Sequence, residues 1–405
     1  MLNASTRVGV VGAGIMGRGI AQVAAAAGHD VVLADARPGA ARDALAAIDA
    51  ALAGLVSKGK IDAAARAAIV GRIRPVDPPG GMRSIETREP LIDVGAFDGC
   101  GLVIEAIVEE LSVKQALLGR IAHEVPLDAV LATNTSSLSV TAIASAVPAP
   151  ERVIGLHFFN PPPLMPLVEV VPWEGTLGAV RDSCTALMTA WGKTAVICTD
   201  TPGFIVNRVA RPFYGEALRL AEEGIADYAT IDWAMRELGG FRMGPFELMD
   251  FIGNDVNFAV TQSVYAGMFY EPRYKPSLTQ QRLVAAGMFG RKTGRGYYDY
   301  RDGAVAPEPK KNEAHGNHIV ERIRAMLINE AVDTLRLHVA SAADIDLAMT
   351  KGVNYPKGLL AWCDELGPGR IMATIEALYD EYAEERYRPS PLLRRASRER
   401  VRFRS

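Results

Sequence analysis

Cysteine, long apolar runs and strong net charge are all scarce in this sequence of 405 residues. The four cysteines include no CxxC pair, so neither a structural zinc site nor a disulfide framework is expected, and no metal is predicted. No run reaches the roughly 20 apolar residues of a membrane-spanning helix. The N-terminus also lacks the basic and apolar segments of a secretion signal. These absences predict a cytoplasmic protein in a reducing compartment, without a membrane partner.

The charge balance excludes another class of partner. Lys and Arg number 44 against 47 Asp and Glu, which gives a formal net charge of −3. A surface of this kind has no overall attraction for nucleic acid, so none is expected as a partner. The length exceeds what one hydrophobic core usually supports, and two or three domains are therefore expected.

The first half of the sequence alternates between apolar runs and helical patterns. Residues 18–27 and 40–55 predict helices. The runs expected to form buried strands of a parallel sheet are apolar on both faces. Those runs are residues 8–11, 31–34, 102–104, 130–132 and 153–156. The segment 75–90 shows neither the helical nor the strand period of apolar residues and is predicted to be a surface loop.

A glycine motif lies between the first strand and the first helix. Gly12 permits a tight turn, Gly14 lets the backbone approach a pyrophosphate, and Gly17 allows the helix to pack closely on the strand. Ile15 and Met16 would then lie at the helix N-terminus that faces the phosphates. Because the motif stands between a strand and a helix, it predicts a dinucleotide site.

The acidic residue that ends the second strand, Asp35, indicates which dinucleotide is bound. Its carboxylate would accept hydrogen bonds from the ribose hydroxyls of NAD. At about 4 Å it would repel the 2′-phosphate of NADP by roughly 4 kcal/mol per unit charge in an effective dielectric near 20. Arg37 is the one counter-signal, because an arginine there can accommodate that phosphate. NAD is therefore the expected cofactor.

Four further stretches carry a resemblance to a known family. They are residues 105–110 (EAIVEE), 133–137 (TNTSS), 155–161 (GLHFFNP) and 200–208 (DTPGFIVNR). With the glycine motif they resemble the L-3-hydroxyacyl-CoA dehydrogenase family, and the resemblance covers about residues 7–300. It implies an NAD-dependent enzyme that oxidises the 3-hydroxyl of an acyl-CoA, or runs the reverse reduction. The setting that it implies is the β-oxidation of fatty or aromatic acids.

The resemblance implies roles for individual residues. The catalytic base falls on His157 and its paired carboxylate on Glu169, while the polar substrate-binding residues fall on Ser136 and Asn207. A neutral imidazole suits removal of a hydroxyl proton near pH 7, and a carboxylate on its other nitrogen would fix the tautomer. Structural alternatives stay open at this stage: an unrelated ion pair for Glu169, a turn or cap for Ser136, and a helix cap for Asn207.

Further residues are implied beside the two large ligands. Those expected beside the nicotinamide half of NAD are Glu109, Lys114, Ser136 and Lys292. Lys58 falls where the family meets the phosphates of CoA.

The second half of the sequence has a helical period and contains a repeat. Residues 216–235 recur as 330–349 at an offset of 114, and residues 274–277 recur as 387–390 at an offset of 113. The copies differ, because Asn207 corresponds to Glu321 and the chain ends in an arginine-rich segment. This segment is expected to be a solvated tail, and contact with the phosphates of CoA is the alternative. Single-copy members of the family form homodimers through the helical domain. We therefore expect the second copy to pack on the first and replace the partner subunit; the expected state is a monomer or a homodimer.

The predicted architecture is an α/β Rossmann-type dinucleotide-binding domain (1–199) followed by two copies of an all-α domain. The resemblance implies the all-α fold of the C-terminal domain of 6-phosphogluconate dehydrogenase for residues 200–300 and 319–405, joined by a linker at 301–318. The predicted function is NAD-dependent oxidation of (S)-3-hydroxyacyl-CoA to 3-oxoacyl-CoA, as a dehydrogenase step alone. The alternatives are a dehydrogenase of free hydroxy acids or sugar acids, and an NAD-binding protein without catalysis.

Overall fold

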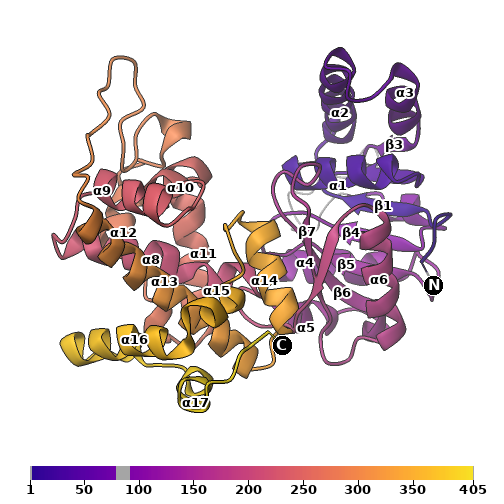
Figure 1. Cartoon of the computed structure of the whole chain (residues 1–405). Coiled ribbons are helices and arrows are strands. Elements are labelled where there is room, and N and C mark those ends of the chain that lie inside the picture. Colours follow the sequence, from indigo (N-terminus) through magenta and orange to yellow (C-terminus); the bar gives the residue numbers. More distant parts are fainter. Residues whose placement is uncertain (1, 79–91, 405) are drawn as a thin grey trace. The chain divides into compact units, whose positions relative to one another are not determined.

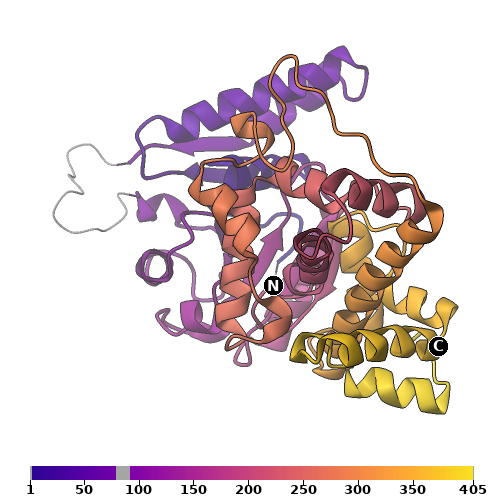
Figure 2. The same ribbon diagram turned by 90° about the vertical axis from the view of Figure 1, so that its left-hand side faces the viewer.

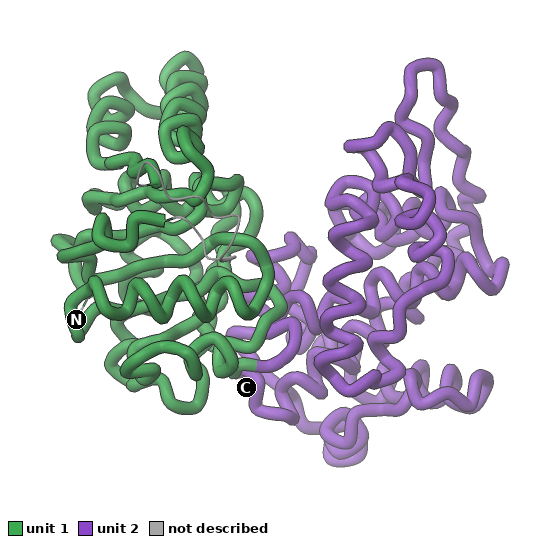
Figure 3. The backbone as a smooth tube through the Cα atoms, turned by 180° about the vertical axis from the view of Figure 1, so that it is seen from behind, with its two compact units in different colours: residues 1–200 green, residues 201–405 purple. Residues whose placement is uncertain are grey.

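The computed structural model describes residues 2–78 and 92–404, which fall into two compact units, residues 1–200 and 201–405 (Figures 1 and 3). The first unit alternates strands and helices, whereas the second is helical. No described helix combines the length and the apolar character needed to cross a membrane.

An eight-stranded sheet forms the centre of the first unit, with strand order β3-β2-β1-β4-β5-β6-β7-β8. The strands are β1 (Val8–Val11), β2 (Val31–Ala34), β3 (Ile73–Val76), β4 (Leu102–Glu105), β5 (Val130–Thr133), β6 (Val153–Phe158), β7 (Leu167–Val171) and β8 (Thr194–Ile197). Neighbouring strands are parallel except for β6 and β7, which are antiparallel. The five strands predicted from apolar runs, β1, β2, β4, β5 and β6, are all confirmed, and they are parallel to one another.

The prediction of a loop over residues 75–90 is wrong at its start. Pro75 and Val76 end strand β3, which pairs only with β2 and therefore lies at the edge of the sheet. An edge strand tolerates proline because a backbone N–H that faces away from the sheet needs no partner in the ladder. Residues 79–91, the larger part of the predicted loop, lie outside the described residues.

Helices cover both faces of this sheet. They are α1 (Ile15–Ala26), α2 (Ala40–Ser57), α3 (Ala63–Gly71), α4 (Leu111–Ile121), α5 (Val140–Ala144) and α6 (Gly178–Ala190). Ile20 of α1, Ile48 of α2 and Met188 of α6 belong to the core on one face. Leu118 of α4 and Ile143 of α5 belong to the core on the other. The chain changes face between β1 and β4, and doubly wound sheets bind ligands at the carboxyl ends of such strands.

The second unit contains the two helical copies. The first has α7 (Val206–Val209), α8 (Arg211–Glu222), α9 (Tyr228–Trp233), α10 (Pro245–Ile252), α11 (Asn254–Gly267) and α12 (Leu278–Ala285). The second has α13 (Glu313–Arg336), α14 (Ala342–Gly352), α15 (Leu359–Leu366), α16 (Pro368–Tyr382) and α17 (Pro391–Glu399), with α16 and α17 side by side (Figure 2). Helix α13 begins inside the predicted linker 301–318, so the end of that linker is helical.

Equivalent residues of the two copies make reciprocal contacts. Arg208 Nε donates to Glu330 Oε1 at 2.7 Å. Its equivalent, Arg322, donates through Nε to Oε2 of Glu216 at 3.1 Å, and Glu216 is the equivalent of Glu330. All four side chains are buried. Each copy therefore supplies one arginine to a glutamate of the other.

The repeated tyrosines follow the same rule. The Tyr274 hydroxyl donates to Glu330 at 2.6 Å, and the Tyr387 hydroxyl donates to Glu216 at 3.0 Å. In a two-fold symmetric dimer residue i of one subunit contacts j of the other and j contacts i. The second copy thus packs on the first, within one chain, in the manner of a symmetric dimer.

An aspartate holds each copy to a later segment of the chain, and it is buried in the first copy (Asp250) and half-buried in the second (Asp364). Asp250 accepts the backbone N–H groups of residues 297 and 298, both at 3.0 Å. Its equivalent in the second copy, Asp364, accepts those of residues 403 and 404, both at 2.8 Å. The arginines of the C-terminal segment are exposed, in agreement with the prediction of a solvated tail, but the end of the chain is held in place because the backbone of residues 403 and 404 donates to Asp364.

Candidate active site

A histidine and a glutamate pair directly across two strands of the first unit. In the antiparallel register of β6 and β7, His157 stands opposite Glu169. Nδ1 of His157 lies 2.6 Å from Oε2 of Glu169, and both residues are buried. A carboxylate can only accept, so it assigns the proton to Nδ1. In the neutral imidazole this tautomer leaves Nε2 as the nitrogen without a proton, as a general base requires.

The loop after β5 is tied to the strand that carries the histidine. Oδ1 of Asn134 accepts the backbone N–H of Phe158, next to His157, at 2.8 Å. The N–H of Asn134 itself donates to the Glu105 carbonyl at the end of β4. Asn134 thereby fixes the loop that contains Ser136 to its two neighbouring strands. Sequence reasoning gave Asn134 no role, although it lies within the TNTSS stretch.

Glu109 is the acceptor at the centre of that loop. It receives the Thr135 hydroxyl at 2.6 Å, the Ser136 N–H at 2.9 Å and the Ser137 hydroxyl at 3.0 Å. Burial alone would raise the pKa of Glu109, but the positive charge of Lys114 and these hydrogen bonds outweigh burial and lower it. Glu109 is therefore an anion, and the structure brings it together with Ser136.

Lys114 lies beneath this anion in a buried ion pair. Its ammonium is 2.6 Å from Glu105 Oε1 and 3.3 Å from Glu109 Oε2, and only 1% of the side chain is exposed. Glu105 also accepts the Thr133 hydroxyl at 2.7 Å. The buried carboxylate of Glu105 holds Lys114 in place, so Lys114 positions the more exposed Glu109. Glu105 was missed by sequence reasoning; a charged residue at the carboxyl end of a buried parallel strand was the available signal.

The glycine motif has the geometry that a phosphate site needs. Gly12 has φ +98°, and a Cβ on Gly17 would lie 1.7 Å from the carbonyl oxygen of Gly12. A Cβ on Gly14 would meet no atom within 4 Å, so the backbone is open at the N-terminus of α1. Ile15 and Met16 form the first turn of this helix. The residues fit a pyrophosphate held at the helix N-terminus.

Asp35 lies beside this motif. Its Oδ2 accepts the N–H of Ala13 at 2.6 Å, and its Oδ1 accepts the N–H of Arg37 at 2.9 Å. These contacts hold the carboxylate at the end of β2, where a ribose hydroxyl would meet it.

The remaining predicted residues belong to other elements of the chain. Lys58 is exposed in the turn between α2 and α3. Asn207 and Lys292 belong to the second unit. Asn207 is half-buried within α7 rather than at the N-terminus of that helix, and the ammonium of Lys292 pairs with Asp255 at 2.6 Å.

Comparison with known families decides what this arrangement belongs to. The NAD binding domain of 3-hydroxyacyl-CoA dehydrogenase matches residues 7–201, and the C-terminal domain of the same family matches residues 203–300 and 318–401. The chain belongs to the 3-hydroxyacyl-CoA dehydrogenase family. It is an oxidoreductase with NAD-dependent 3-hydroxyacyl-CoA dehydrogenase activity, and the resemblance stated from its motifs is confirmed.

Similar proteins span both short and long members of this family. The chain is 40% identical to 3-hydroxyadipyl-CoA dehydrogenase of Escherichia coli, over 97% of this chain and 98% of that protein. It is 40% identical to mitochondrial hydroxyacyl-coenzyme A dehydrogenase of Sus scrofa, over 73% of this chain and 91% of that protein. A crystal structure of 3-hydroxybutyryl-CoA dehydrogenase from Escherichia coli K12 aligns with a TM-score of 0.89 and 39% identity, over 98% and 99% of the two chains. The predicted fold class, a Rossmann-type domain followed by a helical domain in two segments, is confirmed.

Proposed function

We propose that this enzyme oxidises (S)-3-hydroxyacyl-CoA to 3-oxoacyl-CoA with His157 as general base and Glu169 as its partner. The supporting observation is the 2.6 Å contact between the His157 Nδ1 and a Glu169 that is fully buried. The hydroxyl proton of the substrate passes to Nε2 of His157. The carboxylate of Glu169 stabilises the imidazolium that forms. A bound NAD would supply the acceptor for the hydride that leaves the carbon bearing this hydroxyl.

Ser136 and Asn207 are proposed to orient the substrate. The N–H of Ser136 donates to Glu109, which fixes this residue on the rigid loop after β5. A hydroxyl held in this way can bind the 3-oxygen and keep the reacting carbon in a near-attack geometry. Asn207 supplies an amide from the helical unit for the same purpose, and Lys58 supplies an exposed ammonium for the phosphates of CoA.

The cofactor residues are proposed on the same basis. Gly12, Gly14 and Gly17, with Ile15 and Met16, would hold the pyrophosphate of NAD. Asp35 would bind the adenosine ribose. Glu109, Lys114, Ser136 and Lys292 are proposed to border the nicotinamide half, with Lys114 acting through Glu109 because its own ammonium is buried.

The physiological setting is proposed to be β-oxidation of fatty or aromatic acids in the cytoplasm. The names of the two Escherichia coli relatives specify a six-carbon dicarboxylic and a four-carbon substrate. Both kinds of thioester carry the same reacting 3-hydroxyl, so both are candidate substrates here. All four cysteines are free, in keeping with a reducing compartment.

Steady-state absorbance of reduced nicotinamide tests the proposal. The substrates are 3-hydroxybutyryl-CoA, 3-hydroxyadipyl-CoA and free 3-hydroxybutyrate, each with NAD and with NADP. We expect turnover of a thioester with NAD, and a loss of about 10²–10⁴-fold in kcat for His157→Gln. The control is His123→Gln, at an exposed histidine of the same unit. Turnover of the free acid alone, or near-normal kcat in His157→Gln, would contradict the proposal.

A further inference from the structure

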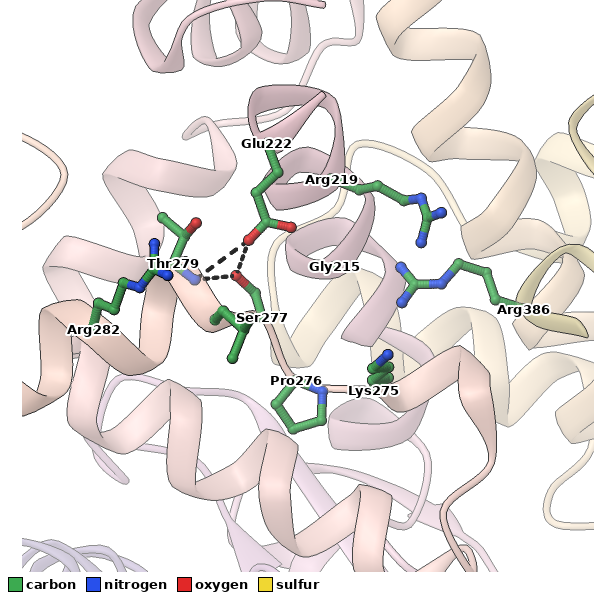
Figure 4. Close-up of a pocket in the computed structure, with 10 residues that line it drawn as sticks. Gly215, Arg219, Glu222, Lys275, Pro276, Ser277, Thr279, Arg282 and Arg386 are labelled. Atoms are coloured by element: carbon green, nitrogen blue, oxygen red, sulfur yellow. Dashed lines mark hydrogen bonds between the residues drawn. The ribbon is translucent and has the colours of Figure 1, made fainter. Parts of the chain in front are cut away.

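A basic pocket of about 440 Å³ lies within the helical unit, and its lining includes none of the residues proposed for catalysis (Figure 4). Its walls are α8, the segment that leads into α12, and the 3-10 helix Glu385–Tyr387 of the second copy. The basic residues of its lining are Arg219, Lys275, Arg282 and Arg386, against the acidic Glu222. The pocket therefore combines side chains of both copies and carries an excess of positive charge.

Arg386 is the most buried of these cations. The residue is only 8% exposed, and in Figure 4 its guanidinium faces that of Arg219. Its nearest carboxylates, those of Glu216 and Glu384, are 3.6 Å and 3.8 Å away. Across the described part of the chain this guanidinium makes no hydrogen bond, and its Nε is buried without a partner. A buried donor without an acceptor is costly, and an anion in the pocket would satisfy it.

Two further cations of the pocket form no ion pair with the described residues. Lys275 and Arg282 are exposed, and no carboxylate of residues 2–78 or 92–404 lies within ion-pair distance of either. The lining carboxylate, Glu222, is itself occupied by the Ser277 hydroxyl at 2.6 Å (Figure 4). A compact, multiply charged anion would therefore meet free donors here.

The repeat supplies an internal comparison, because in the equivalent pocket of about 380 Å³ each of the four lining arginines forms an ion pair. Lys275 corresponds to Arg388, which pairs with Glu271 and Glu385, both at 3.1 Å. At the position equivalent to Arg219, the second copy has Asp333. The basic character of the first pocket is thus a difference between the copies and not a property of the fold.

The Arg386 equivalent shows the same contrast. Arg273 donates to Glu330 at 3.4 Å, to Asp333 at 3.3 Å and to the Arg388 carbonyl at 2.7 Å. The Nε of Arg273 is buried without a partner among the described residues, as is that of Arg386, but the terminal nitrogens of Arg273 donate hydrogen bonds whereas those of Arg386 make only ion-pair contacts at 3.6 Å or more. The first pocket therefore retains more donors for a ligand than the second.

An apolar pocket of about 340 Å³ adjoins the basic one and shares Pro276, Ser277 and Leu278 with it. Tyr265 and Tyr270 line this second pocket, with their ring centroids 5.3 Å apart. Tyr270 is 65% exposed and has φ +64°, in the left-handed region that costs a residue with a side chain free energy. The chain thus presents an aromatic face beside a cluster of cations.

We propose that these two pockets bind a nucleotide, with its phosphates in the basic pocket and its base against the tyrosines. Phosphate oxygens are the acceptors that guanidinium groups match best. Aromatic side chains bind the face of any base by stacking. The joint volume is that of a small-molecule site. The nucleotide is either free or the nucleotide portion of a coenzyme, and the test separates these sources.

Calorimetric titration of the full chain with ADP tests the proposal, with NADH kept saturating so that the dinucleotide site is filled. We expect ADP to bind. The substitutions Lys275→Met and Arg282→Met should each lower the affinity for ADP about tenfold or more, because each removes a charged contact. Tyr270→Ala should lower the affinity for ADP but leave the affinity for inorganic pyrophosphate unchanged. Arg388→Met, in the equivalent pocket, is the matched control and should leave ADP binding unchanged.

Coenzyme A is titrated in the same way. If Lys275→Met lowers the affinity for both CoA and ADP, the occupant is the nucleotide portion of the coenzyme. If it lowers the affinity for ADP alone, the occupant is a free nucleotide. The proposal is overturned if ADP does not bind, if Lys275→Met binds it normally, or if Arg388→Met weakens it equally. Pyrophosphate binding as tight as that of ADP, with no effect of Tyr270→Ala, would overturn the assignment to a nucleotide.

Discussion

Replacing Glu169 with glutamine removes the buried negative charge and keeps the size of the side chain. In the native site this carboxylate lies 2.6 Å from Nδ1 of His157. The imidazolium that forms during proton transfer is attracted to it by roughly 4 kcal/mol, for charge centres about 4 Å apart in an effective dielectric near 20. Since about 1.4 kcal/mol is worth a factor of ten in rate, kcat of Glu169→Gln should fall roughly 10³-fold.

The assay is single-turnover formation of reduced nicotinamide, because slow product release can conceal a change in the chemical step. KM should change little, since the interaction strengthens only as charge develops on His157. Glu174→Gln, at an exposed glutamate just beyond β7, is the control and should keep normal rates. A folded Glu169→Gln enzyme that binds NADH normally and loses less than about tenfold in rate would refute the proposed pairing.

Further predictions concern the cofactor, the packing of the copies and pH. Asp35→Ala should raise kcat/KM with NADP relative to NAD at least about tenfold, because a repulsive charge is removed; an unchanged ratio would contradict this role. Glu330→Gln and Glu216→Gln should each lower the free energy of unfolding in urea by about 3–5 kcal/mol, since each removes the buried carboxylate to which a buried arginine donates through Nε. Because the contacts of the two glutamates are reciprocal, the two variants should lose similar free energies of unfolding, and very unequal losses would contradict the symmetry. Sedimentation velocity should show a monomer; a homodimer formed through the face that α8 presents to α13 would refute replacement of the partner subunit. Burial raises the pKa of Asp232 to about 7, although hydrogen bonds to this carboxyl lower it. The stability that this group contributes is then full below its unfolded pKa of about 3.9 and is lost as pH rises through about 7. From pH 5 to 8 the native chain should lose more unfolding free energy than Asp232→Asn, and identical pH profiles would contradict the shift.

The predictable part of the fold is the part where local pattern and burial agree. Strand β1 is apolar on both faces because helices cover both sides of the sheet, so its pattern is visible in the sequence. Strand β3 has an exposed Arg74 followed by Pro75, and its identity as a strand depends on pairing with β2, which no local pattern reveals. The antiparallel β7 was likewise not predicted as a strand, although Glu169 within it was singled out.

The site shows the same division. The pairing of His157 with Glu169 followed from family motifs, and its physical basis is the register between two strands. The ion pair between Lys114 and Glu105 depends on where α4 lies over β4, which sequence spacing does not define. The docking of the C-terminal segment on Asp364 was missed for a similar reason, since only the repeat structure shows that Asp364 needs partners there.

Joining two copies in one chain releases them from the requirement of identical sequence. In a homodimer every interface substitution occurs twice, so a cation and an anion cannot occupy the same position in the two halves. Here Arg219 and Asp333 do so, and Glu222 and Arg336 form a second such exchange. The reciprocal contacts of Glu216 and Glu330 preserve the old symmetry at the centre of the interface. Within one chain, the pocket that contains Arg219 can therefore acquire a ligand while the equivalent pocket that contains Asp333 keeps its ion pairs and stabilises the fold.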